Sequence, residues 1–134
     1  MANSLTTEIL ADGPVNYIVK VVGVLDTSDL VATVLINPVT MSPINFGVNP
    51  TQFKIDRIVF AVENGLEVRL QWDATAPIYV MDLTGTGHQE YKSFGGLTNN
   101  AGAGKTGQLL ISTQGWTAAA ILSFSAVIEC IKQP

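Results

Sequence analysis

Apolar side chains in this chain recur at every second position along several segments. In the segment 66–72, leucine, valine and tryptophan alternate with glutamate, arginine and glutamine. Successive side chains of a β-strand point to opposite faces, so this alternation predicts a strand that buries one face. No window of ten or more residues shows convincing helical periodicity. The sequence therefore predicts an all-β fold.

A short turn signal precedes that strand. The dipeptide Asn64–Gly65 separates it from a second run of apolar and β-branched residues, 55–62. Asn-Gly suits a two-residue type I′ turn because both positions tolerate positive φ. The sequence predicts a β-hairpin over residues 54–72.

The C-terminal segment 121–131 alternates as well, but both of its faces carry apolar residues. One face holds Leu122, Phe124, Ala126, Ile128 and Cys130. The opposite face mixes serine and glutamate with Ile121, Val127 and Ile131. A strand covered on both sides, by the core and by a neighbour, has this composition.

Further strands are expected from runs of β-branched residues, which bring the total to about eight. These runs are 17–25, 30–37, 77–83, 90–94 and 107–113. Turn-forming clusters separate them at 26–29, at 37–50 with three prolines, at 85–87, and at 95–107 with five glycines. This number and spacing predict a single-domain antiparallel β-sandwich of the jelly-roll type.

The domain is expected to span residues 15–134. The preceding segment, 1–14, is polar and ends at Gly13–Pro14, which predicts an N-terminal arm that reaches a neighbouring subunit. Residues 1–8 lack the basic and apolar regions of a signal peptide, so synthesis in a cytoplasm is expected. The longest apolar run near the start is interrupted by Lys20 and is too short to span a membrane.

Charge is scarce in this sequence. Seven basic and eleven acidic residues among 134 are about half the usual share, whereas 47% of the residues are hydrophobic. The net charge of −4 argues against a nucleic-acid partner, which would require clustered basic residues. A surface with so few charges is poorly equipped to stay monomeric, so we expect another protein to cover part of it.

The segment Gly102–Gly107 contains Gly-Lys-Thr, the centre of a phosphate-binding P-loop. The full motif needs a glycine where this chain has Asn99, and it needs a helix after the loop. Residues 107–113 are expected to form a strand instead. A flexible glycine-rich loop without a nucleotide or other cofactor is the preferred interpretation.

No catalytic, metal-binding or cofactor-binding residues are assigned, and the protein is not expected to be an enzyme. His88 is the only histidine. Asp82 and Glu90 are the carboxylates considered with it for a metal site, but a solvated turn is the preferred interpretation for His88. If His88 lies at an interface between subunits instead, its protonation is expected to tune assembly. Asp26 and Asp29 are interpreted as turn residues, and the single cysteine, Cys130, as a small hydrophobic residue of the core.

The aromatic residues leave one alternative open. This alternative is a sugar-stacking platform made of Trp72, Tyr79, Tyr91 and Trp116, although most aromatic residues of such a chain are expected in the core. A receptor- or glycan-binding module is therefore the alternative function.

Three segments carry a resemblance to a known family: Leu70–Pro77, Tyr91–Gly102 and Thr106–Thr113. The chain resembles small virion proteins of tailed bacteriophages, in particular the jelly-roll decoration (cement) proteins on the outside of the head. The similarity covers most of residues 15–132, and it transfers no functional residue to a numbered position. The resemblance implies a homotrimer on the outer capsid surface, at local threefold positions, that binds the major capsid protein and clamps neighbouring capsomers.

Overall fold

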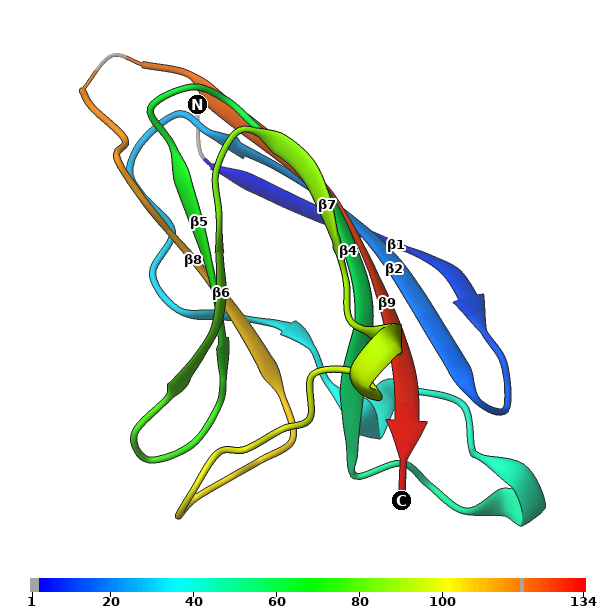
Figure 1. Ribbon diagram of the computed structural model, residues 1–134. Coiled ribbons are helices and arrows are strands. Elements are labelled where there is room, and N and C mark those ends of the chain that lie inside the picture. The colour runs from blue at the N-terminus through cyan, green and yellow to red at the C-terminus, as the bar shows by residue number, and fades with distance from the viewer. Residues whose placement is uncertain (1–2, 119) are drawn as a thin grey trace.

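The computed structural model describes residues 3–118 and 120–134. These residues form two antiparallel β-sheets that pack against each other, as Figure 1 shows, and strands make up 56% of the chain. The nine strands are β1 (Ser4–Asp12), β2 (Asn16–Leu25), β3 (Thr33–Ile36), β4 (Gln52–Val62), β5 (Glu67–Trp72), β6 (Ile78–Leu83), β7 (Thr86–Glu90), β8 (Leu109–Gln114) and β9 (Leu122–Gln133). The predicted all-β sandwich is confirmed.

Helical structure in the described residues consists of single 3₁₀ turns. They are η1 (Pro38–Thr40), η2 (Asn45–Gly47) and η3 (Lys92–Phe94). Within that part of the chain, no helix has the length and the apolar character needed to cross a membrane.

The strand order is that of a jelly roll with one extra strand. The larger sheet has the order β1-β2-β9-β4-β7, and the smaller has the order β3-β8-β5-β6. The pairs β2 with β9, β3 with β8, β4 with β7 and β5 with β6 are nested, like the arms of one long hairpin whose tip joins β5 to β6. Rolling up such a hairpin produces the two sheets of a jelly roll. Strand β1 is added at the edge beside β2.

The core lies between the sheets and is built from every second residue of the central strands. In β9, the predicted inner face from Phe124 to Cys130 is buried. Phe53 of β4 and Trp72 of β5 meet across the two sheets with their ring centroids 5.3 Å apart in an edge-to-face contact. Both side chains are almost completely buried, so this pair ties the sheets together at the centre of the core.

The predicted hairpin over residues 54–72 is wrong in its pairing. Both strands exist, but β4 pairs with β7 and β9, whereas β5 pairs with β6 and β8 in the other sheet. The turn is closed by a hydrogen bond from Leu66 N to Glu63 O at 3.1 Å. Gly65 has a positive φ of 88°, but Asn64 does not, so the type I′ turn is not formed. With a positive φ at its third residue alone, the turn does not match the twist of a hairpin, so the flanking strands splay apart. They continue into different sheets.

The strand expected at 90–94 is also wrong, as is the separator at 85–87. Strand β7 begins at Thr86 and ends at Glu90, and η3 follows it. All five residues of β7 are exposed, so no buried face exists to produce an alternating pattern. Backbone hydrogen bonds to β4 hold this edge strand, and such bonds leave no pattern of apolar residues in the sequence.

The segment 1–14, predicted as an arm, contributes strand β1 in its residues 4–12. It pairs with β2 from Ser4 opposite Val24 to Asp12 opposite Tyr17, with a bulge at Leu10. The sandwich therefore begins at residue 4 rather than at residue 15. Like β7, β1 is an edge strand with few buried side chains, which is why its sequence lacks the strand pattern.

Candidate interaction surfaces

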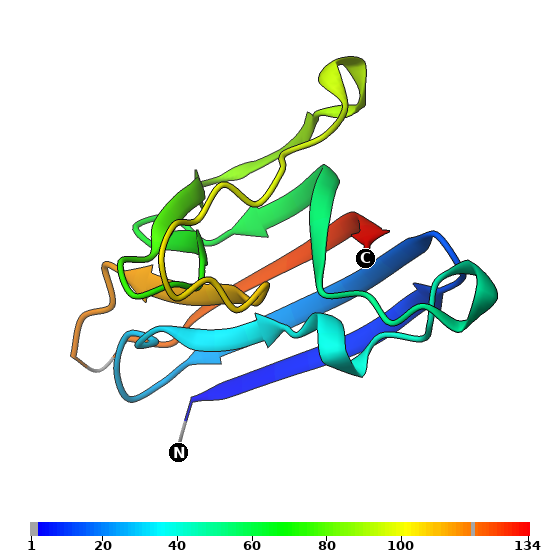
Figure 2. The same ribbon diagram turned by 90° about the horizontal axis from the view of Figure 1, so that it is seen from below.

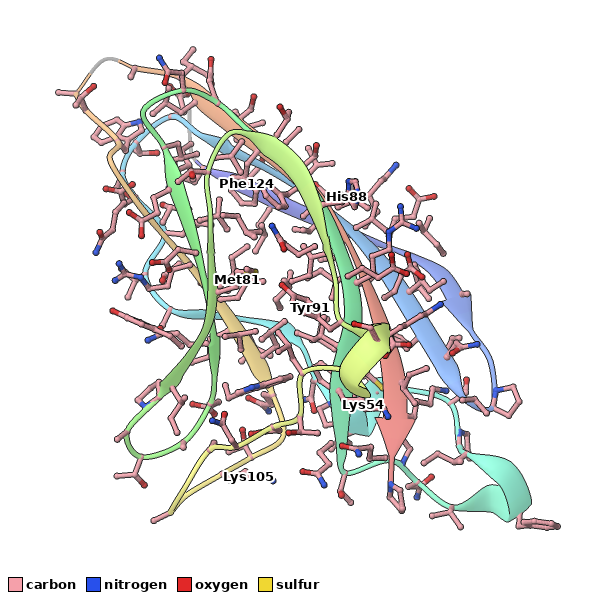
Figure 3. All side chains as sticks on the ribbon, in the orientation of Figure 1. Lys54, Met81, His88, Tyr91, Lys105 and Phe124 are labelled. Atoms are coloured by element: carbon pink, nitrogen blue, oxygen red, sulfur yellow. The ribbon has the colours of Figure 1, made fainter. Side chains whose placement is uncertain are left out.

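The three residues considered for a metal site lie apart. His88 and Glu90 are exposed on β7, whereas Asp82 lies on β6 in the other sheet and accepts a hydrogen bond from Arg69 Nε at 3.2 Å. Figure 3 shows His88 on the outer side of β7 and Tyr91 between the sheets. Among the described residues, no cluster of three His, Cys, Asp or Glu side chains is placed to hold a metal ion. His88 lies on a strand rather than in the predicted turn.

The glycine-rich segment is tied into the fold rather than shaped for a phosphate. Thr106 Oγ1 donates to Asp73 Oδ2 at 2.8 Å, and Lys105 Nζ donates to the backbone oxygen of Asn99 at 3.2 Å. Strand β8 follows the segment, as predicted, so the motif has no helix N-terminus to bind a phosphate.

The remaining candidates have structural roles. Asp29 accepts hydrogen bonds from Thr113 Oγ1 at 3.0 Å and from Trp116 N at 3.1 Å, which ties the β2–β3 loop to β8 and the segment after it. The backbone nitrogen of Asp26 donates to Asn3 Oδ1 at 2.8 Å. Cys130 is buried in the core as predicted, and burial raises the pKa of its thiol far above the ordinary value, so the thiol is unreactive.

The four aromatic residues do not form one platform. Trp72 and Tyr91 are buried, and Trp116 is half-buried with its Nε1 donating to Ala120 O at 3.0 Å. Tyr79 is exposed, and the guanidinium of Arg69 lies 4.6 Å from the centre of its ring. Tyr79 borders a hollow of about 460 Å³ between β6 and the loop 95–100.

Exposed apolar side chains occur on several sides of the sandwich. The large ones are Ile9, Leu10, Val15, Val22, Val31, Val34, Val39, Phe46, Val48, Tyr79 and Ile121. They come from both sheets and from several loops, so they do not form one binding patch. Single exposed apolar residues are ordinary, but a chain with so few charges offers little to offset this many.

The Phe46 loop, residues 37–50, carries the most exposed of these side chains. Phe46 is fully exposed at its tip, and Val39 is 80% exposed. The tip is closed by hydrogen bonds from Ile44 N to Val48 O at 2.7 Å and from Gly47 N to Ile44 O at 3.1 Å. These bonds hold the tip in a defined shape.

Phe46 also has an unusual backbone. Its φ of 65° and ψ of 23° lie in the left-handed region, and it is the one residue other than glycine with a positive φ in the described part of the chain. This conformation costs an L-residue about 1–2 kcal/mol, and such strain often accompanies a functional role.

A buried lysine ammonium anchors the base of this loop, and we call this arrangement the Lys132 clamp. The Lys132 side chain is completely buried, and its Nζ donates hydrogen bonds to Asp12 Oδ1, to Gly13 O at 2.6 Å and to Ser42 O at 2.7 Å. The carboxylate of Asp12 also accepts bonds from the backbone nitrogen and the hydroxyl of Ser42. Three segments far apart in the sequence therefore meet at one charge.

The clamp changes the titration of Asp12. Burial alone would raise the pKa of this carboxyl, but hydrogen bonds from Lys132 and Ser42 outweigh burial and lower the pKa below its ordinary value. Figure 2 shows the turn between β1 and β2 beside the Phe46 loop at this end of the sandwich. The clamp thus fixes the loop against the sandwich and pre-organises its exposed tip.

The outer face of the five-stranded sheet, which points away from the smaller sheet, is the second surface of interest. Val59 of β4 lies opposite Val127 of β9, and in the next row Ala61 lies opposite Ser125, which faces Val22 of β2. The small side chains of Ala61 and Ser125 leave the surface hollowed between these valines, with volumes of about 420 and 150 Å³ on the two sides. These residues of β9 belong to the mixed face described in the sequence analysis. The structure confirms that the opposite face of β9 packs on the core. That a neighbouring molecule covers the mixed face stays a prediction.

Comparison with known proteins adds no relative. No family model, no curated protein and no solved structure matches this chain. The function is therefore argued from the two surfaces just described and from the composition of the chain.

Proposed function

We propose that this protein is a virion structural protein of a tailed bacteriophage that decorates and stabilises the capsid shell. In this proposal it binds the major capsid protein on the outer surface of the head as a homotrimer at local threefold positions. The observation that carries the proposal is the spread of exposed apolar side chains over several sides of a weakly charged sandwich. A subunit set among copies and capsomers needs contacts on several sides, whereas a receptor-binding module needs one site.

The arrangement of the charges supports this function. Several of the few charged side chains pair with one another on the surface of the same chain. Lys20 Nζ lies 3.1 Å from Glu8, and Arg57 lies 3.5 Å from Glu129. Such pairs compensate each other locally, so a neighbouring protein meets a largely neutral surface. Neutral, partly apolar surfaces are typical of permanent interfaces.

The mechanism of stabilisation would be mass action. A protein that binds the assembled shell but not the free capsid subunits stabilises the shell by RT ln(1 + [L]/Kd) per site, about 2.7 kcal/mol at a concentration of 100 Kd. A trimer that contacts three capsomers also gains effective concentration for its second and third contacts. Many weak contacts on different sides of the sandwich then sum to a stable coat.

Solution mass and shell binding test this function. We expect light scattering of the purified protein to give the mass of three chains. We also expect the protein to co-sediment with empty heads of its phage until a fixed number of sites is filled, and to raise the temperature at which the heads break. Heads already coated with the protein serve as the control and should take up no more. A stable monomer that ignores the heads would contradict the proposal.

A glycan-binding module is the second candidate, and the hollow beside Tyr79 is the observation that favours it. Thr98 and Asn100 line this hollow beside the exposed ring of Tyr79. An exposed tyrosine ring beside amide groups is a common arrangement for binding sugars.

If this candidate is right, a glycan array should show a defined binder, and Tyr79→Ala should weaken its binding by about tenfold or more. Val31→Ala, which truncates an exposed side chain on another side, is the matched control. An array without signal at high protein concentration would remove this candidate.

A further inference from the structure

Phe46 has the features of an anchor side chain that lacks its partner. It is fully exposed, it stands on a strained backbone, and the closed tip of its loop holds it in place. The hydrophobic effect disfavours an exposed phenyl ring, and the strain adds to the cost. Aromatic side chains held rigidly in this way are typical hot spots of protein interfaces.

The outer face of the five-stranded sheet offers a site of the matching kind. The hollow of about 150 Å³ beside Ala61 and Ser125 is bordered by Val59, Val127 and the stem of Lys20. The hollow is an open depression rather than a closed cavity, but its volume is about that of an apolar cavity that holds benzene, so it has room for a phenyl ring. The second hollow of about 420 Å³ adjoins it through the same alanine and serine, which leaves room for the tip of a loop.

The electrostatics of the two surfaces also agree. No charged residue occurs between Asp29 and Lys54, so the whole Phe46 loop is neutral. Among the described residues that border the smaller hollow, Lys20 alone carries a charge, and Glu8 holds that ammonium at 3.1 Å. Docking the phenyl ring in the smaller hollow therefore does not strand an unpaired charge, which is the main cost of burying a polar surface.

We propose that Phe46 of one copy inserts into the hollow between Val59, Ala61 and Val127 of a second copy. Every copy carries one such loop and one such hollow, on different parts of its surface. A contact between two different patches joins copies head to tail, and such a chain closes into a ring when the rotation permits. This inference rests on the homotrimer of the proposed function and names the contact that builds it.

Photo-cross-linking from position 46 tests the contact directly. With Phe46→p-benzoylphenylalanine, irradiation should produce covalent dimers on a denaturing gel, and mass spectrometry should find position 46 joined to residues 59–63 or 122–127. The same analogue at Val31, which is also highly exposed, should not link to these peptides. No covalent dimer, or dimers joined elsewhere, would overturn the inference.

Two substitutions provide an independent measurement. Phe46→Ala removes the anchor, and Ala61→Trp fills the hollow from an exposed position, so neither disturbs the core. Each should weaken trimer assembly by about 30-fold or more in sedimentation equilibrium, whereas Ala118→Trp in an exposed loop should leave it unchanged.

The outcomes separate this inference from the proposed function. A trimer that binds heads but survives both substitutions would refute the Phe46 contact and leave the decoration function standing. Cross-links from position 46 to the major capsid protein alone would also refute it. A monomer that ignores heads would refute both.

Discussion

Replacing Lys132 by methionine is expected to lower the free energy of unfolding by about 3–5 kcal/mol, the usual cost of breaking a buried ion pair. Methionine keeps most of the length of the side chain but donates no hydrogen bond. The carboxylate of Asp12 and the backbone oxygens of Gly13 and Ser42 would each lose a donor inside the protein. Urea denaturation followed by far-ultraviolet circular dichroism measures the change.

Lys20→Met is the matched control for this substitution. Lys20 also pairs with a carboxylate, Glu8, but both side chains are largely exposed. Exposed pairs contribute about 0–1 kcal/mol, so the control should remain close to the parent protein. Equal effects of the two substitutions would show that the Lys132 clamp does not stabilise the fold.

The same clamp predicts a pH dependence. The pKa of Asp12 is lower in the folded protein than in the unfolded chain, where it takes its ordinary value of 3.8. The unfolded chain then binds more protons at low pH, so the stabilisation is complete above pH 3.8 and is lost as the pH falls through the folded pKa. Asp12→Asn should therefore destabilise the protein at pH 7 and have a much smaller effect near pH 2. A constant difference across this range would contradict the assignment.

Gly107→Ala is expected to destabilise the protein by about 2–5 kcal/mol. Gly107 has a φ of +82°, where a left-handed conformation costs about 1–2 kcal/mol for an L-residue. A Cβ at this position would also clash with the backbone oxygen of Thr51 and approach Pro38 to 3.2 Å, and overpacking of this kind typically costs about 1–3 kcal/mol.

Gly102→Ala, in the same glycine-rich segment, is the control. A Cβ there meets nothing within 4 Å, and the backbone does not have a positive φ, so the stability should change by less than about 1 kcal/mol. Thermal and urea unfolding of the two variants measure the contrast. If both variants lose a similar amount of stability, the close contacts of Gly107 are not the reason for the glycine at that position.

The inner faces of the strands were predictable because alternation records burial directly. Every second residue from Phe124 to Cys130 and from Val68 to Trp72 lies in the core, as the alternation predicts. The pattern failed for β1 and β7, which are edge strands held by backbone hydrogen bonds that any side chain permits.

The Lys132 clamp and the Phe46 loop were less accessible to prediction. Lys132 continues the inward positions of β9, so a lysine among core positions was a signal for a buried charge. Phe46 offered no such signal beyond the absence of charge around it, because an apolar residue in a loop is expected to pack inward rather than stand exposed. The alternation of apolar residues marks neither of them as part of a site.

Local patterning and composition already specified an all-β sandwich with few charged residues. The two-residue spacing of apolar side chains and the number of charged residues belong to the sequence itself, so they are the same whichever strands pair. Pairing between strands is different, because backbone hydrogen bonds are the same for every partner and only packing selects among them. The tertiary structure, which brings together segments that lie far apart in the chain, therefore decided three features. They are the passage of the chain from one sheet to the other at Asn64–Gly65, the Lys132 clamp, and the exposed tip at Phe46.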